Sequence, residues 1–119
     1  MKDPEELLPL TPAVFHILLA AADGPRHGYA IMTQIASSTD GQLRMGPGTL
    51  YGSIKRMIAA GLLEESDRRP EDRGDDHRRR YYRLTPYGRR VATAESRRIS
   101  CLAALARSKG LIRPAIEKG

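Results

Sequence analysis

The residues best suited to recognition chemistry lie between Gly46 and Gly61, in a segment that carries a helix signal at both ends. Pro47 suits the first helical position, where its missing N–H is not needed, and Gly61 suits the left-handed residue after the last turn. One face of the predicted helix is an apolar stripe that we expect to be core, formed by Leu50, Ile54, Met57 and Ile58.

The other positions of this segment carry small hydroxyls, an aromatic ring and two cations. Such side chains hydrogen-bond to base edges and phosphates in a DNA groove. An isolated helix of this kind is more often a solvated surface, but its neighbours in the sequence favour a recognition helix. The predicted DNA-binding residues of the helix are Pro47, Gly48, Thr49, Tyr51, Ser53, Lys55 and Arg56.

Other chemistry finds little support in the sequence. Asp75, Asp76 and His77 have no established metal-site spacing, and no metal or other cofactor is expected. The sequence has no Gly-rich phosphate loop, no nucleophile elbow and no pair of carboxylates in an apolar setting, so we do not expect an enzyme. Cys101 has helical spacing beside Leu102, which favours an interface or core thiol over a nucleophile.

Two further helices precede the recognition segment. Thr11-Pro12 is a cap-and-proline start for a helix over 13–22, and Asp3-Pro4 predicts a short turn before it. A second helix is predicted over 29–38, and His27 before it is interpreted as a loop or first-turn residue that packs locally. The chain therefore presents three helices in succession up to Gly61.

The spacing of the apolar residues changes from helical to strand-like after Gly61. Residues 62–66 and 80–85 read as strands, with Tyr82 and Leu84 predicted on one face and Tyr81 and Arg83 on the other. The connection over 67–79 has no apolar residue, which predicts a β-hairpin with a long solvated tip. The expected fold is mainly α with a small β-hairpin, and residues 1–85 are interpreted as a winged helix-turn-helix domain.

Arginines in the predicted wing are candidates for phosphate contact, because the guanidinium fork pairs bidentately with phosphate. The same tip carries several acidic residues, so a role in solubility alone stays open. The predicted DNA-binding residues of the wing are Arg73, Arg78, Arg79 and Arg80.

Thr85-Pro86 predicts the start of a last helix that ends near Lys109. Gly110 suits the left-handed residue after its last turn, and Leu111 suits the apolar contact of a Schellman motif. Its apolar stripe is too long to be covered by the small domain before it, so residues 86–119 are interpreted as a dimerisation helix and tail. The predicted interface of a homodimer consists of Val91, Ala94, Arg98, Ile99, Leu102, Leu105 and Ala106.

Charge is unevenly distributed over the 119 residues. Residues 1–60 hold five basic and five acidic side chains, whereas residues 61–119 hold fifteen and nine, so the whole net charge of +6 lies in the second half. This excess suits a polyanionic partner. The lone cysteine, the absence of a membrane-length apolar run and the absence of a signal-peptide pattern predict a cytoplasmic protein.

The chain resembles the PadR family of bacterial transcriptional regulators. The motifs that carry the resemblance are His27-Gly28-Tyr29, the run from Gly46 to Tyr51, Arg56-Met57 with Gly61-Leu62-Leu63, and Tyr81 to Thr85 with Gly88. They span roughly residues 10–90 in the family's order, and the single final helix resembles the short-tailed branch.

The resemblance implies a homodimeric winged-helix repressor that binds a palindromic operator in double-stranded DNA, with Thr49, Tyr51 and Lys55 facing the DNA. It also implies a possible small-molecule effector that releases the DNA. Some relatives hold flat aromatic drugs between tryptophans, and this chain has no tryptophan. Two alternatives stay open: a winged-helix module for protein–protein interaction without specific DNA binding, and a small-molecule-carrying dimer that has lost its DNA role.

Overall fold

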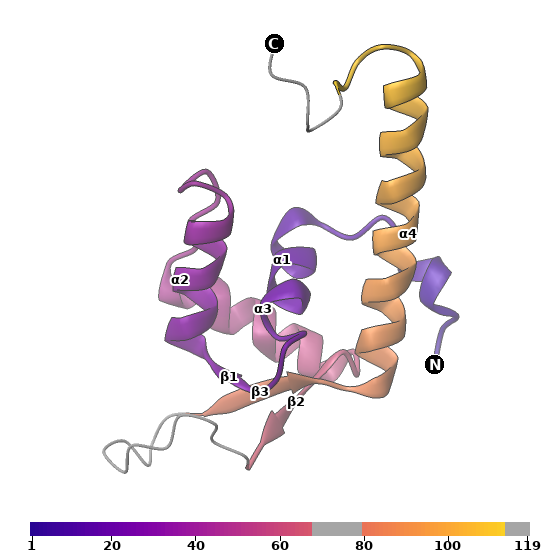
Figure 1. Cartoon of the computed structure of the whole chain (residues 1–119). Coiled ribbons are helices and arrows are strands. Elements are labelled where there is room, and N and C mark those ends of the chain that lie inside the picture. Colours follow the sequence, from indigo (N-terminus) through magenta and orange to yellow (C-terminus); the bar gives the residue numbers. More distant parts are fainter. Residues whose placement is uncertain (68–79, 114–119) are drawn as a thin grey trace.

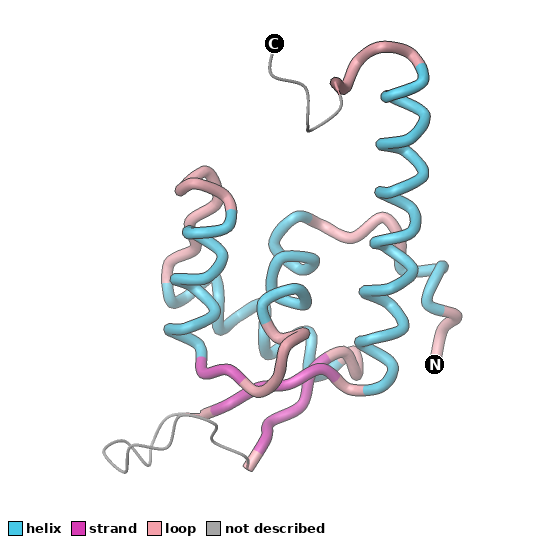
Figure 2. Tube along the Cα trace, in the orientation of Figure 1, coloured by secondary structure: helices cyan, strands magenta, loops and turns pink. Residues whose placement is uncertain are grey.

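The computed structural model describes residues 1–67 and 80–113 and is mostly helical, with one small sheet (Figures 1 and 2). Three helices cluster above the sheet, and the last helix rises beside them and projects beyond the cluster (Figure 1). The predicted fold class is confirmed. The elements in order are η1 (Pro4–Leu7), α1 (Pro12–Ala20), β1 (Arg26–His27), α2 (Gly28–Ser38), α3 (Pro47–Ala59), β2 (Leu63–Ser66), β3 (Tyr81–Leu84) and α4 (Pro86–Ser108).

Helix starts follow the cap-and-proline pattern of the sequence. The Thr11 hydroxyl accepts a hydrogen bond from the Val14 N–H at 3.2 Å, and Thr85 accepts one from the Gly88 N–H at 2.8 Å. A proline occupies the next position in both helices, where no N–H is required. Helix α3 has the proline but no side-chain cap, because its N-cap residue is Gly46.

Helix ends are set by residues in the left-handed conformation. Gly61 after α3 has φ of 82° and Gly110 after α4 has φ of 78°. In each case the next N–H returns to a carbonyl inside the helix, from Leu62 to Met57 at 2.9 Å and from Leu111 to Ala106 at 3.0 Å. These are Schellman closures, and the predicted ends of both helices are confirmed.

The sheet has three strands in the order β1-β3-β2, all antiparallel, rather than the predicted two. The additional strand is Arg26–His27, which pairs with Tyr82 and Tyr81. A strand of two residues has too little alternation to be recognised in a sequence, and its pairing partner lies more than fifty residues away. The prediction of a simple hairpin was therefore incomplete.

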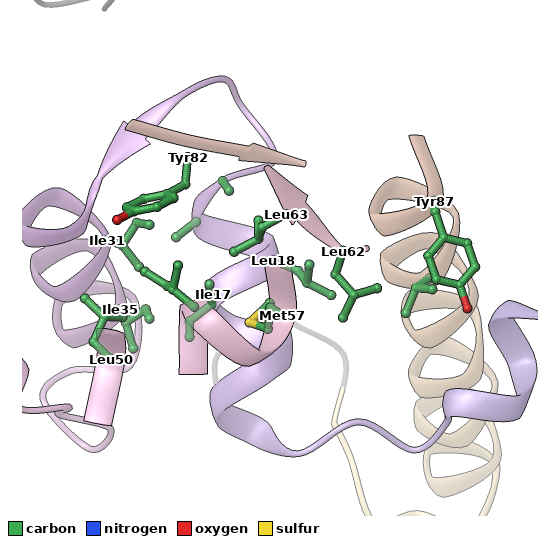
Figure 3. Close-up of a cluster of buried hydrophobic side chains, with 14 residues drawn as sticks. Ile17, Leu18, Ile31, Ile35, Leu50, Met57, Leu62, Leu63, Tyr82 and Tyr87 are labelled. Atoms are coloured by element: carbon green, nitrogen blue, oxygen red, sulfur yellow. The ribbon is translucent and has the colours of Figure 1, made fainter. Parts of the chain in front are cut away.

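Strand β3 is covered on both faces at its start. Tyr82 is 5% exposed and lies near Ile31 of α2 in the core, while Tyr81 on the other face is 6% exposed (Figure 3). The Tyr81 ring meets the His27 ring edge-on, with 5.4 Å between centroids. The alternation was predicted correctly, but the second face is buried at Tyr81, where the ring of its cross-strand partner His27 packs against it.

The core is largely aliphatic, as the composition predicts, and α1, α2, α3 and the sheet all contribute to it (Figure 3). Two predictions about it need correction. Ile58 is 37% exposed and lies at the rim, whereas Val91, predicted for the dimer interface, is fully buried in the chain's own core. The fully buried aliphatic side chains are Ile17, Leu18, Ile31, Ile35, Leu50, Ile54, Leu63 and Val91.

Helix α4 begins in close contact with the end of α3. The Thr85 hydroxyl donates to the Gly61 carbonyl, and a Cβ built on Gly88 would lie 2.0 Å from the Leu62 carbonyl oxygen. Only glycine allows this approach of two backbones. The first turn of α4 is thereby fixed to the helix that carries the predicted recognition residues.

No helix within 1–67 or 80–113 has the length and apolar character needed to span a membrane.

Candidate nucleic-acid interface

Helix α3 presents one polar face on a rigid foundation. Leu50, Ile54 and Met57 are at most 3% exposed and anchor the helix in the core. The opposite positions are open to solvent, and α3 brings together most of the residues that the sequence predicts for DNA contact. The exposed members of that set are Pro47, Gly48, Thr49, Tyr51, Lys55 and Arg56.

Ser53 differs from the prediction. Its side chain is 5% exposed and its hydroxyl accepts a hydrogen bond from Arg56 Nη2 at 3.3 Å. The residue lies at the core edge of α3 because it shares a helical face with Leu50 and Met57. Ser53 is therefore suited to orienting the Arg56 guanidinium rather than to contacting a ligand directly.

Tyr51 leans across the gap between α3 and α2. A Cβ added to Gly28 would lie 2.2 Å from the Tyr51 phenolic oxygen, so the phenol rests directly on the first residue of α2. The side chain is still 44% exposed. Tyr51 thus packs against the start of α2, a contact that the sequence did not reveal, while part of its side chain stays exposed to solvent.

His27 supports the same corner of the molecule. It is the N-cap of α2, where its Nδ1 accepts a hydrogen bond from the Ala30 N–H at 3.2 Å, and the residue is 8% exposed. The interpretation of His27 as a locally packed first-turn residue is confirmed.

Tyr82 lies on the strand that pairs with β1. Burial, followed by the nearby Glu65 carboxylate, raises the pKa of Tyr82, so its phenol stays neutral.

The base of the wing is a ladder of exposed ion pairs. Arg80 pairs with Glu65 at 3.0 Å and Arg83 pairs with Glu64 at 2.8 Å, across β2 and β3. Exposed pairs of this kind contribute little free energy, so Arg80 can exchange its carboxylate for a phosphate at small cost. Other predicted wing residues lie outside the described residues, namely Arg73, Arg78, Arg79 and the sequence Asp75-Asp76-His77. Elsewhere, the described side chains form no acidic, histidine or cysteine cluster able to hold a metal ion.

The comparison with known families decides the class of this winged helix. Residues 17–94 match the model of the transcriptional regulator PadR-like family, and the matched range runs from within α1 into the first half of α4. The chain belongs to the PadR-like family. Its members are transcriptional regulators, a non-enzymatic class.

A curated relative that is a transcriptional regulator agrees with this assignment. The PadR-like chain is 42% identical over 88 residues to a transcriptional regulator of Mycobacterium tuberculosis, which covers 74% of this chain and 76% of that protein. It is also 43% identical over 81 residues to an uncharacterized transposon protein of Streptomyces fradiae. That match covers 67% of this chain but only 21% of the transposon protein.

Solved structures support the fold of the PadR-like chain. A PadR family transcription regulator from Clostridium difficile aligns with a TM-score of 0.67 and 20% identity, over 82% of this chain and 97% of that one. A transcriptional regulator from Clostridium thermocellum aligns with a TM-score of 0.64 and 24% identity, over 81% and 87% of the two chains.

The second half of α4 in the PadR-like protein carries an unburied apolar face. Ile99 is 39% exposed, and Leu102 and Leu105 are each 53% exposed. Ala94 and Ala106 are half-buried, and Arg98 is partly covered because it pairs with Glu95. Cys101 is exposed, which excludes a core thiol and leaves the interface as its prediction.

Proposed function

We propose that this PadR-like regulator is a homodimer that binds a palindromic operator sequence-specifically, with α3 in the major groove. The observation that carries the proposal is the exposed face of α3, where Thr49, Lys55 and Arg56 project from a helix anchored by three buried apolar residues. A recognition helix needs both features, since rigid presentation reduces the entropy lost on binding.

We assign phosphate contact to exposed cations on α3 and beside it. Arg80 at the base of the wing is exposed and held only by a surface ion pair, and Lys55 and Arg56 are exposed without a carboxylate partner among the described ion pairs. The wing arginines at 73, 78 and 79 remain predicted contacts. Phosphate contacts supply the salt-dependent part of affinity, and base contacts supply specificity.

The homodimer is supported by the exposed face formed by Ile99, Leu102 and Leu105. These side chains continue the apolar stripe of α4 from Val91, which is buried in the chain's own core. The stripe therefore extends beyond the part of α4 that the domain covers. Pairing with a second copy would bury the remainder. Two recognition helices in neighbouring major grooves would then lie about 34 Å apart, one turn of the duplex.

Repression and release by a small-molecule effector are the finer parts of the proposal, and they rest on the family resemblance. A cavity of about 610 Å³ between the N-terminal segment and α4 has the size of small-molecule sites. Its lining is partly apolar, from Leu8, Ala94 and Cys101, and it carries charges of both signs, including Arg90, Arg97, Asp3 and Glu5.

Selection of bound DNA from a random or genomic pool tests the function. The expected result is an enriched sequence with two-fold symmetry and half-sites about ten base pairs apart. Failure to retain any fragment at low salt would contradict DNA binding and favour the alternative, a winged-helix module that binds an acidic protein partner.

A further inference from the structure

Glu95 is the one buried carboxylate in the described part of the chain, with 1% of the residue exposed. Both oxygens are engaged. The Leu10 N–H donates to Oε2 at 3.0 Å, and the Arg98 guanidinium donates to Oε1 and, at 3.1 Å, to Oε2. The sequence pattern did not single out this residue, because its backbone partner lies 85 positions away.

The bond from Leu10 ties α4 to the start of α1, since Leu10 precedes Thr11, the N-cap of that helix. A second polar contact ties α4 to the other end of α1. Arg89 Nη2 donates to the Ala22 carbonyl at 2.9 Å, two residues after α1 ends. The two contacts fix how α4 runs along α1, because hydrogen bonds have defined partners whereas apolar contacts can slide.

The charge of Glu95 is unexpected at its position. Val91 and Ile99 lie one turn to either side on the same face of α4, so an apolar residue at 95 would continue the stripe. A buried ion pair carries a desolvation penalty that often cancels its attraction, and its better attested use is to specify one arrangement. Glu95 is therefore better suited to fixing the direction of α4 than to adding stability alone.

Direction matters here because α4 connects the recognition unit to the proposed dimer contact. Arg89 and Glu95 hold α4 against α1, and Leu102 and Leu105 follow on the next turns. A tilt of α4 relative to α1 would therefore move the partner's recognition helix. Two-fold symmetry would apply the same tilt in both protomers.

We infer that Glu95 is a positioning residue that sets the separation of the two recognition helices, and with it the preferred spacing of DNA half-sites. The inference rests on the proposed function as a DNA-binding homodimer. Glu95 itself touches no DNA in this arrangement, and its effect reaches the DNA through the orientation of α4.

The test uses the full chain and duplexes that carry two selected half-sites, with the spacing varied one base pair at a time. Wild type, Glu95→Ala, Glu95→Gln and the exposed neighbour control Ser96→Ala are compared by binding titration, with sedimentation to confirm the dimer. Glutamine retains an acceptor for the Leu10 N–H but removes the ion pair with Arg98. It also guards against Glu95→Ala failing to fold.

Wild type and Ser96→Ala are expected to share one sharp spacing optimum. In Glu95→Ala, affinity for a single half-site should persist, while the ratio between the best and the next spacing should fall roughly five- to tenfold, a typical size for coupling between sites. Glu95→Gln retains the acceptor for the Leu10 N–H and should keep the wild-type optimum. A dimeric Glu95→Ala with the wild-type spacing profile, or a Glu95→Gln that loses the wild-type optimum, would overturn the inference and leave the proposed function intact. A wild-type protein that binds no duplex would overturn the proposed function, and the inference with it.

Discussion

The phenol of Tyr51 rests on the Cα of Gly28, so that the predicted recognition helix is braced against the first turn of α2. A Cβ on Gly28 would fall 2.2 Å from the phenolic oxygen and 2.5 Å from the ring carbon that bears it. The two residues belong to separate sequence motifs, His27-Gly28-Tyr29 and the run from Gly46 to Tyr51, and the contact brings these motifs together. It adds a close contact between α2 and α3 to the packing of their buried side chains in the core.

Substitution Gly28→Ala should lower the free energy of unfolding by about 1–3 kcal/mol, because the added methyl overpacks against Tyr51. In a Tyr51→Ala background the same substitution should be close to neutral or slightly stabilising, since alanine is the better helix former. Urea unfolding of the two single variants and the double variant measures this coupling. Additive effects would show that the contact is not energetically significant.

Substitution Gly88→Ala should destabilise the fold more severely. The new Cβ would lie 2.0 Å from the Leu62 carbonyl oxygen, and a backbone atom cannot swing aside as a side chain does. We expect a decrease of about 3 kcal/mol or more in the free energy of unfolding, the upper end for overpacking. Gly48→Ala in α3 is the matched control, since a Cβ there meets nothing within 4 Å. Equal thermal midpoints for the two variants would contradict the close approach.

The pair between Glu95 and Arg98 should give stability a measurable pH dependence. The hydrogen bond from Arg98 holds the pKa of Glu95 below its usual range, helped by the Leu10 N–H and opposed by burial. The folded protein then releases this proton more readily than the unfolded chain does. The stabilisation is therefore present above the ordinary glutamic acid pKa of about 4.3, and it is lost as the pH falls through the lower folded value.

Glu95→Gln removes this titration. Between about pH 6 and about pH 3, the wild-type free energy of unfolding should fall more steeply than that of the variant, because only the wild type loses this contribution. Urea midpoints at a series of pH values provide the measurement. Parallel curves for the two proteins would show that Glu95 is not the titrating group.

The exposed end of α4 gives a prediction about assembly. Leu102→Glu should convert the dimer to a monomer at micromolar concentration, because a carboxylate would replace a leucine at the centre of the proposed contact. Ala104→Glu adds the same charge on the opposite, exposed face of the helix and should remain dimeric. Sedimentation of both variants decides the matter, and two monomers or two dimers would both contradict the assignment of this face.

Local rules made much of the fold predictable. Thr11 and Thr85 before prolines, and Gly61 and Gly110 after helices, mark boundaries within a few residues of sequence, and the structure follows them. The apolar stripe of α3 was predictable for the same reason. Ile58 was not, because a helical wheel shows which face is apolar but not how far the neighbouring elements extend.

Non-local features were not predictable. The pairing of Arg26 with Tyr82 and the bond between Leu10 and Glu95 join residues that are far apart in sequence, and no spacing rule connects them. Ser53 was assigned to the polar face by residue type alone, but burial depends on neighbours that only the fold supplies. The exposed polar face of α3 was therefore predictable, whereas the contacts that support it were not.

Lys55 provides the most direct test of α3 as the DNA-contacting helix. In a salt titration on the selected operator, Lys55→Ala should bind more weakly, and the slope of log K against log salt concentration should become shallower. The expected change is about 0.9 for each phosphate that the lysine no longer neutralises, or about 1.8 for two protomers. Lys109→Ala, an exposed cation at the far end of α4, should retain the wild-type slope. Wild-type affinity and slope in Lys55→Ala would contradict the assignment of α3 as the recognition helix.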